Sequence, residues 1–177
     1  MELWEQACAL HMEHKFDEAE KIYVQLLEQN HDNTGLMATL GSLYVQTGRI
    51  GLGIHFLEAA IKGGLKQTDV LTNLGIGYKR AGQTKKARMY FDESIKEEPS
   101  PESLANYSGL LIESGQGARC IEMCEQAIKE KPELPVVHWN LALCLLTEGI
   151  WGRGWDEHEW GLKQTDVLTN LGIGYKR

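Results

Sequence analysis

The sequence lacks an excess of basic residues, and it lacks any long apolar run. It carries 18 lysines and arginines against 25 aspartates and glutamates, which gives a formal net charge of −7 over 177 residues. Nucleic acids and anionic membranes are bound by surfaces rich in lysine and arginine, so neither is an expected partner. No segment approaches the ~20 apolar residues of a membrane-spanning helix, and residues 1–6 lack the basic-then-apolar order of a signal peptide. We therefore expect a cytoplasmic location.

Cysteine is also scarce, and no two cysteines form a Cys-x-x-Cys pair. The four cysteines are Cys8, Cys120, Cys124 and Cys144. Their scatter does not indicate a disulfide framework. We expect all four to be reduced and to pack as small apolar residues.

No constellation of catalytic or metal-binding residues stands out. Cys8, His11 and His14 follow one another at three-residue spacing, but such positions drift around a helix and no fourth ligand is evident. His158 stands between two glutamates without a nucleophile beside it. We therefore expect no metal, no cofactor and no enzymatic activity.

What the sequence does contain is an internal repeat. Small residues recur at spacings of 34, 33 and 34, at Gly41, Gly75, Ser108 and Ala142. Seven residues after each comes a glycine, at Gly48, Gly82, Gly115 and Gly149. Five residues further on comes another small residue, at Gly53, Ala87, Cys120 and Gly154. This pattern is typical of antiparallel helix pairs, in which small residues let the two helices approach and the glycine permits the turn between them.

Large apolar residues and helix-start signals fit the same pairs. Leu40 and Tyr44 are spaced as one face of a first helix, and Leu57 and Ile61 as one face of a second helix. Ser100 followed by a proline is typical of a helix N-cap, and Pro135 also suits a helix start. Because one helix pair cannot bury its apolar face alone, neighbouring pairs are expected to stack into one core.

These residues resemble the tetratricopeptide repeat family. The resemblance covers residues 1–160 as five helix pairs, near residues 2–33, 34–67, 68–100, 101–134 and 135–160. It implies an all-α fold, a right-handed superhelical solenoid of antiparallel helix pairs. The first repeat matches least well: Trp4, Phe16, Ala19 and Tyr23 fit, but the turn between its helices is expected to be one residue short.

The resemblance also implies a binding surface, because the first helix of each pair lines the concave side. The residue two before each small position is expected to point into this groove, at Thr39, Asn73, Asn106 and Asn140. An amide offers both donors and an acceptor, which suits the backbone of an extended peptide. The row is similar to the asparagine ladder of the repeat region in O-linked N-acetylglucosamine transferase. The alternative is that these amides link adjacent repeats or cap the chain locally.

Other residues are expected to face the same groove. Lys79 and Arg80 form its one clear basic spot, and Trp139 is either an aromatic anchor or a packing contact with the next repeat. The remaining expected groove residues are Asp69, Thr72, Glu102, Glu113 and Thr147. The predicted function is a scaffold that binds a partner protein, or an extended peptide of it, in the concave groove.

The end of the chain repeats an earlier segment without a difference. Residues 161–177 are identical to residues 64–80, at an offset of 97 that is not a multiple of the repeat length. We expect a helix over residues 166–176, either capping its own chain or exchanged with a second copy. A homodimer through residues 161–177, and hence a self-assembling scaffold, is an alternative function.

Residues 154–160, Gly-Trp-Asp-Glu-His-Glu-Trp, carry a second resemblance. They are similar to the Gly-Trp-x-x-Tyr-Glu-Trp phrase that closes the repeat region of many bacterial and phage proteins with glycosyltransferase domains. His158 stands where tyrosine is usual. A substrate-presenting module of a glycosyltransferase is therefore the other alternative.

Overall fold

The computed structural model describes residues 2–163, which form ten α-helices and no strand. Residues 1–97 hold α1 (Leu3–Met12), α2 (Phe16–Gln29), α3 (Thr34–Gln46), α4 (Ile50–Lys62), α5 (Thr68–Arg80) and α6 (Thr84–Glu97). Residues 98–177 hold α7 (Pro101–Glu113), α8 (Gly117–Glu130), α9 (Pro135–Thr147) and α10 (Trp151–Lys163). The predicted all-α fold is confirmed. None of the described helices is both long and apolar enough to cross a membrane.

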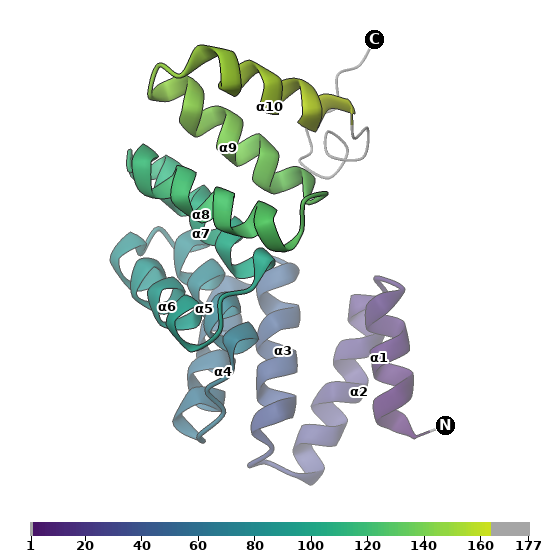
Figure 1. Cartoon of the computed structure of the whole chain (residues 1–177). Helices are drawn as coiled ribbons and strands as arrows, with labels where there is room; N and C mark the ends of the chain where they lie inside the picture. Colours follow the sequence, from purple (N-terminus) through teal and green to yellow (C-terminus); the bar gives the residue numbers. More distant parts are fainter. Residues whose placement is uncertain (1, 164–177) are drawn as a thin grey trace. The chain divides into compact units, whose positions relative to one another are not determined.

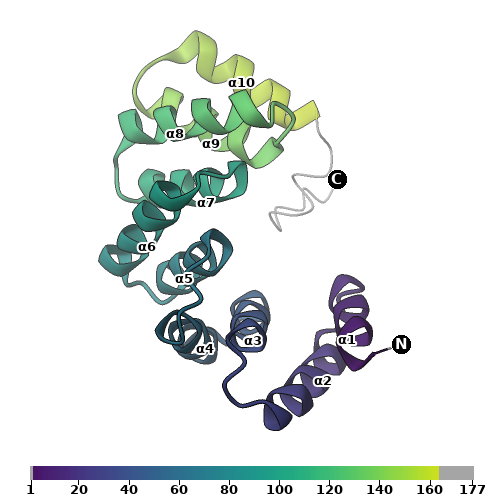
Figure 2. The ribbon, with the colours of Figure 1, turned by 60° about the horizontal axis from the view of Figure 1, so that its bottom comes forward.

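The two segments are separate compact units, and each is built from helix pairs. In the first unit, α1, α3 and α5 lie on one side and α2, α4 and α6 on the other (Figures 1 and 2). In the second unit, α7 pairs with α8, and α9 with α10 (Figure 1). Among the first helices, α3 contacts α5 in the first unit and α7 contacts α9 in the second.

Each turn inside a helix pair passes through a residue with positive φ. The four predicted glycines adopt this conformation, with φ of 82°, 72°, 66° and 78° at Gly48, Gly82, Gly115 and Gly149. In the first pair His14 takes the same place with φ 59°. The expectation that this turn is one residue short is therefore wrong. The repeat keeps its full length, and a histidine in a left-handed conformation conceals the glycine pattern.

The small residues lie where the helices of a pair touch, as predicted. A Cβ on Gly41 of α3 would lie 2.7 Å from Leu57 Cγ and 3.1 Å from the carbonyl oxygen of Gly53 in α4. A Cβ on Gly53 would lie 2.9 Å from the backbone nitrogen of Val45. The backbones of α3 and α4 approach so closely that no side chain fits between them.

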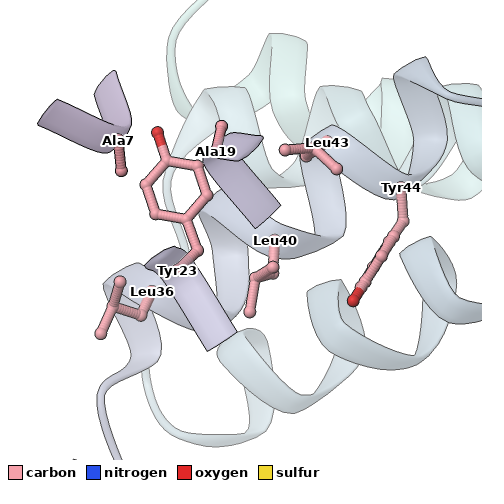
Figure 3. Close-up of a cluster of buried hydrophobic side chains, with 7 residues drawn as sticks. All are labelled: Ala7, Ala19, Tyr23, Leu36, Leu40, Leu43 and Tyr44. Carbon is pink, nitrogen blue, oxygen red and sulfur yellow. The ribbon is translucent and has the colours of Figure 1, made fainter. Parts of the chain in front are cut away.

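A cluster of buried apolar side chains joins the first two helix pairs of the first unit (Figure 3). Its buried members are Ala7, Ala19, Tyr23, Leu36, Leu40, Leu43 and Tyr44. The edge of this cluster is polar: the Tyr44 hydroxyl donates to Glu20 at 3.0 Å, and Arg49 pairs with the same carboxylate at 2.7 Å. The core of α1 and α2 therefore continues into α3, as stacked repeats require.

Helix starts in the second unit follow the predicted signals. Ser100 caps α7 by accepting the backbone N–H of Ser103 at 3.1 Å, and the Ser103 hydroxyl accepts the backbone N–H of Ser100 in return. Pro101 is the first residue of α7, and Pro135 is the first residue of α9. Proline is favoured there because that backbone nitrogen has no partner inside the helix.

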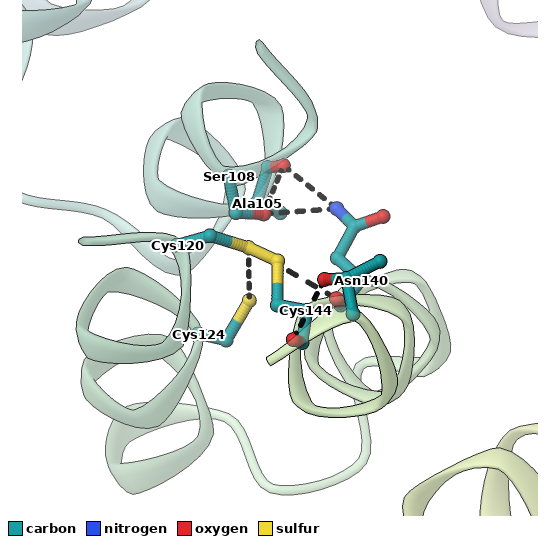
Figure 4. Close-up of a disulfide and its surroundings, with 7 residues drawn as sticks. Ala105, Ser108, Cys120, Cys124, Asn140 and Cys144 are labelled. Atoms are coloured by element: carbon teal, nitrogen blue, oxygen red, sulfur yellow. Dashed lines mark hydrogen bonds between the residues drawn. A yellow bond between two sulfur atoms is a disulfide. The ribbon is translucent and has the colours of Figure 1, made fainter. Parts of the chain in front are cut away.

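The second unit contains a disulfide, which the sequence did not lead us to expect. Cys120 of α8 is bonded to Cys144 of α9, with their Cα atoms 6.5 Å apart (Figure 4). The prediction of four reduced cysteines is wrong for this pair. Cys120 occupies a small position of its own repeat, and Cys144 lies on the first helix of the next repeat, so the stacking of adjacent repeats brings them together. Cys124 remains a thiol beside them, and burial raises its pKa to about 11.

The last described helix extends slightly past its expected end. The fifth helix pair was predicted near residues 135–160, and α10 extends to Lys163. The helix predicted over residues 166–176 lies outside the described residues.

Candidate functional site: a groove between the first helices

A groove of about 400 Å³ lies on the first-helix side of the first unit. Its lining comes from α1 (Trp4, His11), from α3 (Gly35, Ala38, Thr39, Ser42), and from α5 with the loop before it (Leu65, Gln67, Asp69, Val70, Asn73). The four residues from α3 are spaced i, i+3, i+4 and i+7, so they form one helical face. Because all four are small, this face makes a recessed floor.

Two predicted ladder residues, Thr39 and Asn73, line this groove. The Thr39 hydroxyl donates to the carbonyl oxygen of Gly35 at 3.0 Å, within its own helix. Asn73 Nδ2 donates to the Ser42 hydroxyl at 2.9 Å, which links α5 to α3. Within the described part of the chain Asn73 Oδ1 accepts no hydrogen bond, so it is available to an N–H group of a ligand.

Asp69 gives the groove a negative charge. Asp69 is exposed and forms no ion pair with any described residue. No lysine or arginine is among the described residues that line the groove. Trp4, 43% exposed, supplies an aromatic wall whose ring centroid lies 5.6 Å from that of Tyr23. The groove therefore combines an apolar wall, an amide and an unpaired carboxylate.

The other two asparagines lie in the second unit and differ from each other. Asn140 is only 8% exposed, and its Nδ2 donates to the Ser108 hydroxyl at 2.8 Å and to the Ala105 carbonyl at 3.2 Å (Figure 4). Asn106 Nδ2 donates to the carbonyl oxygen of Glu102 in its own helix at 2.9 Å. The alternative role of linking or local capping is thus observed for these amide N–H groups.

The remaining predicted residues do not line the groove. Arg80 Nη1 donates to the carbonyl oxygen of Val45 at 2.5 Å, and Lys79 is half-buried beside it in sequence. Trp139, in the second unit, is half-buried with its ring centroid 5.3 Å from that of His158 in α10. This contact is with the second helix of its own pair and not with the next repeat, so the role of Trp139 as an anchor stays a prediction.

The prediction that Thr72 faces the groove is wrong. Thr72 is 8% exposed, and its hydroxyl lies 2.7 Å from the Ser94 hydroxyl of α6. Thr72 precedes Asn73 by one residue, and one residue rotates a side chain by about 100° around a helix. That rotation turns Thr72 away from the groove and into the contact with the second helix of its pair.

Trp4, His11 and Ser42 line the groove although the sequence pattern did not predict a binding role for them. The signal that would have found the groove is the small face of α3, because four small residues on one exposed helical face leave space beside a tryptophan. Cys8 Sγ and His11 Nδ1 both lie at the Tyr23 hydroxyl, at 3.8 Å and 3.5 Å, and His11 Nε2 lies 3.1 Å from Gln46 Oε1. In residues 2–163 no group of three or more His, Cys, Asp or Glu side chains is arranged to hold a metal ion.

No family model matches the chain, but solved structures share its arrangement of helices. YrrB, described as a TPR protein with an unusual peptide-binding site, is 16% identical over 97% of this chain and 89% of its own, with a TM-score of 0.71. MamA is 16% identical over 93% of this chain and 96% of its own, with a TM-score of 0.76. The fold is that of a tetratricopeptide repeat protein. PilF of Pseudomonas aeruginosa also has it, at 15% identity over 91% of this chain and 74% of its own, with a TM-score of 0.80.

Proposed function

We propose that this tetratricopeptide repeat chain is a non-catalytic scaffold that binds an extended segment of a partner protein in the groove lined by α1, α3 and α5. The observation that carries the proposal is the recessed floor of α3 between Trp4 and Asn73. A volume of about 400 Å³ is within the range of ligand-binding clefts. The peptide-binding site named for YrrB supports a peptide as the ligand class.

Different groove residues recognise different groups of the ligand. Asn73 Oδ1 accepts a backbone N–H of the ligand, while Trp4 packs against an apolar side chain. Asp69 favours a lysine or arginine near the same place, because its carboxylate has no partner within residues 2–163. The preferred ligand is therefore an extended segment with an apolar and a basic side chain.

The other residues predicted to bind the peptide remain part of the proposal, as a second group of ligand contacts. Its members are Asn106, Asn140, Lys79, Arg80 and Trp139. They lie outside the groove of α1, α3 and α5, so their contribution is measured separately from that of Thr39 and Asn73.

The test is peptide selection on the intact chain, followed by one substitution made at two places. Peptides are selected from a random display library, and their dissociation constants are measured by fluorescence anisotropy. Thr39→Trp fills the floor of the groove, whereas Thr84→Trp places the same side chain at the exposed start of α6. We expect Thr39→Trp to weaken binding at least tenfold and Thr84→Trp to leave it unchanged. Equal affinity in the two variants, or the absence of any selected peptide, refutes groove binding.

The glycosyltransferase-linked module is the second candidate, and residues 154–160 favour it. In the structure these residues hold α10 on α9. A Cβ on Gly154 would lie 2.8 Å from Leu146 Cδ2, Glu157 bonds to His138, and the Trp160 ring stacks on His138 at 3.7 Å. A transferase domain encoded in the same or an adjoining gene would support this candidate, and its absence there would remove it.

The cytoplasmic location predicted from the sequence remains a proposal; the Cys120–Cys144 bond argues against it and also provides its test. Cytosolic proteins keep their thiols reduced, whereas secreted and periplasmic proteins keep disulfides. Trapping thiols with an alkylating agent in intact cells, followed by mass spectrometry, distinguishes the two states. Alkylated Cys120 and Cys144 fit the cytoplasm, and an intact disulfide places the chain in an oxidising compartment.

A further inference from the structure

α10 exposes a stripe of large apolar side chains. Trp151, Trp155 and Leu162 are 61%, 56% and 40% exposed. Their spacing places them on neighbouring turns of one side of the helix. A soluble surface rarely exposes such a patch unless another protein surface covers it.

The equivalent side of α4 shows what covers such a stripe. Gly154 corresponds to Gly53 in the repeat, so Trp155 corresponds to Ile54 and Glu159 to Glu58. In the first unit α5 lies on this side of α4. A Cβ on Gly77 of α5 would lie 3.1 Å from Ile54 Cγ1, and the Tyr78 hydroxyl donates to the Glu58 carboxylate. A glycine followed by a tyrosine on the covering helix therefore matches an apolar residue, and a glutamate one turn after it, on the covered helix.

The chain carries the sequence of α5 a second time. Residues 161–177 repeat residues 64–80, so Gly174 and Tyr175 match Gly77 and Tyr78. The residue pair that covers α4 in the first unit therefore occurs again shortly after α10, and within residues 2–163 no helix covers the corresponding side of α10.

A helix that matches α5 would begin at Thr165, two residues after Lys163, the last described residue of α10. The segments that join a second helix to the next first helix are residues 30–33, 63–67, 98–100 and 131–134. After α10 only residue 164 precedes Thr165, which matches Thr68, the first residue of α5. The two copies differ here, because Gly64–Lys66 lie in a loop whereas the identical Gly161–Lys163 are helical in α10. If residues 165–177 take the helical conformation of their twin, one connecting residue would not reverse the chain onto its own α10, because helix hairpins need two or more.

We infer that the α10 face formed by Trp151, Trp155, Glu159 and Leu162 is covered by residues 165–177 of a second copy of this chain, as α5 covers α4. Each copy provides one segment and one face, so two copies exchange segments in a closed dimer. This inference concerns a different surface from the peptide groove and does not depend on it.

The experiment is light scattering of the full chain over a concentration series, with two matched pairs of variants. Gly174→Val removes the close fit to Trp155, and Asp166→Asn alters the residue that matches the groove-facing Asp69. Trp155→Asp places a charge on the α10 face, and Met89→Asp places the same charge on an exposed residue of α6.

We expect the wild-type mass to double from 19.9 kDa as the concentration rises. Gly174→Val and Trp155→Asp should raise the midpoint concentration at least tenfold, and the two control variants should shift it less than twofold. Gly174 lies beyond the described helices, so its variant remains informative even if Trp155→Asp lowers the helical circular dichroism.

Three results would overturn the inference. One is a mass of 19.9 kDa at every concentration, and another is a dimer that persists in a chain ending at Lys163. The third is a dimer that Gly174→Val does not weaken. Thr39→Trp serves as a cross-check, because it should abolish peptide binding and leave the dimer intact. Failure of the groove proposal is thus distinguishable from failure of this one.

Discussion

Glycine-to-alanine substitution should change stability in opposite directions at two places ten residues apart. At Gly41 the new Cβ meets Leu57 Cγ at 2.7 Å, Leu57 N at 3.0 Å and the Gly53 carbonyl oxygen at 3.1 Å. Two of these three atoms belong to the backbone of α4, so a change of rotamer does not relieve the contact. At Gly51 a Cβ meets nothing within 4 Å.

The magnitudes follow from two opposing effects. Replacing a helical glycine by alanine stabilises a protein by about 0.5–1 kcal/mol, because the unfolded chain loses conformational freedom. Overpacking a well-packed contact costs about 1–3 kcal/mol. Gly51→Ala should therefore raise the free energy of unfolding by about 0.5–1 kcal/mol, subject only to the first effect. Gly41→Ala should lower it by about 1–2 kcal/mol, because the second effect is larger.

The assay is urea denaturation followed by circular dichroism at 222 nm, with both variants and the wild type measured side by side. A double variant with Gly53→Ala adds a check. Because Gly41 and Gly53 share one contact, moving the helices apart once should relieve much of the second cost. Destabilisation by Gly51→Ala, or no change in Gly41→Ala, would show that α3 and α4 do not approach as closely as described.

Further predictions concern a buried amide, a strained turn and a buried thiol. Asn140→Ala should lower the free energy of unfolding by about 1–3 kcal/mol, because it removes two hydrogen bonds between helices. Asn106→Ala removes only a bond within one helix, so it should change the free energy of unfolding by less than about 0.5 kcal/mol. Urea denaturation measures both variants. His14→Gly should raise the melting temperature, because glycine adopts the positive φ of that turn without strain; a lowered melting temperature would contradict this. Stability should fall from about pH 9 toward about pH 11, because the Cys124 pKa is about 11 in the folded chain against an ordinary 9.0, so the unfolded chain ionises first. The fall should be shallower in Cys124→Ala when unfolding is measured across that range.

The repeat was predictable from the sequence because small residues are required wherever two helices touch. Gly41 and its counterparts recur at nearly constant spacing for that reason, and they reveal the helix pairs without any alignment. His14 interrupts the pattern, because a left-handed turn accepts a histidine at some energetic cost. The first repeat was therefore predicted with the wrong turn length, although its buried Ala7 and Ala19 hold the expected register.

The binding surface was less predictable, because a groove depends on which side chains are missing from it. Thr39 and Asn73 were selected by their position in the repeat, and both line the groove. Thr72 was assigned to the same face although it lies one residue, and about 100°, away from Asn73. Nothing in the order of the sequence indicates the Cys120–Cys144 bond, because the two residues meet only after adjacent repeats stack.

That bond has a consequence for how the second unit opens. In a stack of helix pairs each pair is stabilised mainly by its immediate neighbours, so the outermost pair can separate first. The link from α8 to α9 closes a sequence separation of 24 residues, a span for which a disulfide contributes about 3 kcal/mol. With the bond closed, amide hydrogens in α9 and α10 should exchange at the same rate as those in α7 and α8; with it reduced, α9 and α10 should exchange first. The redox state of a single bond thus sets how many helices open as one cooperative group.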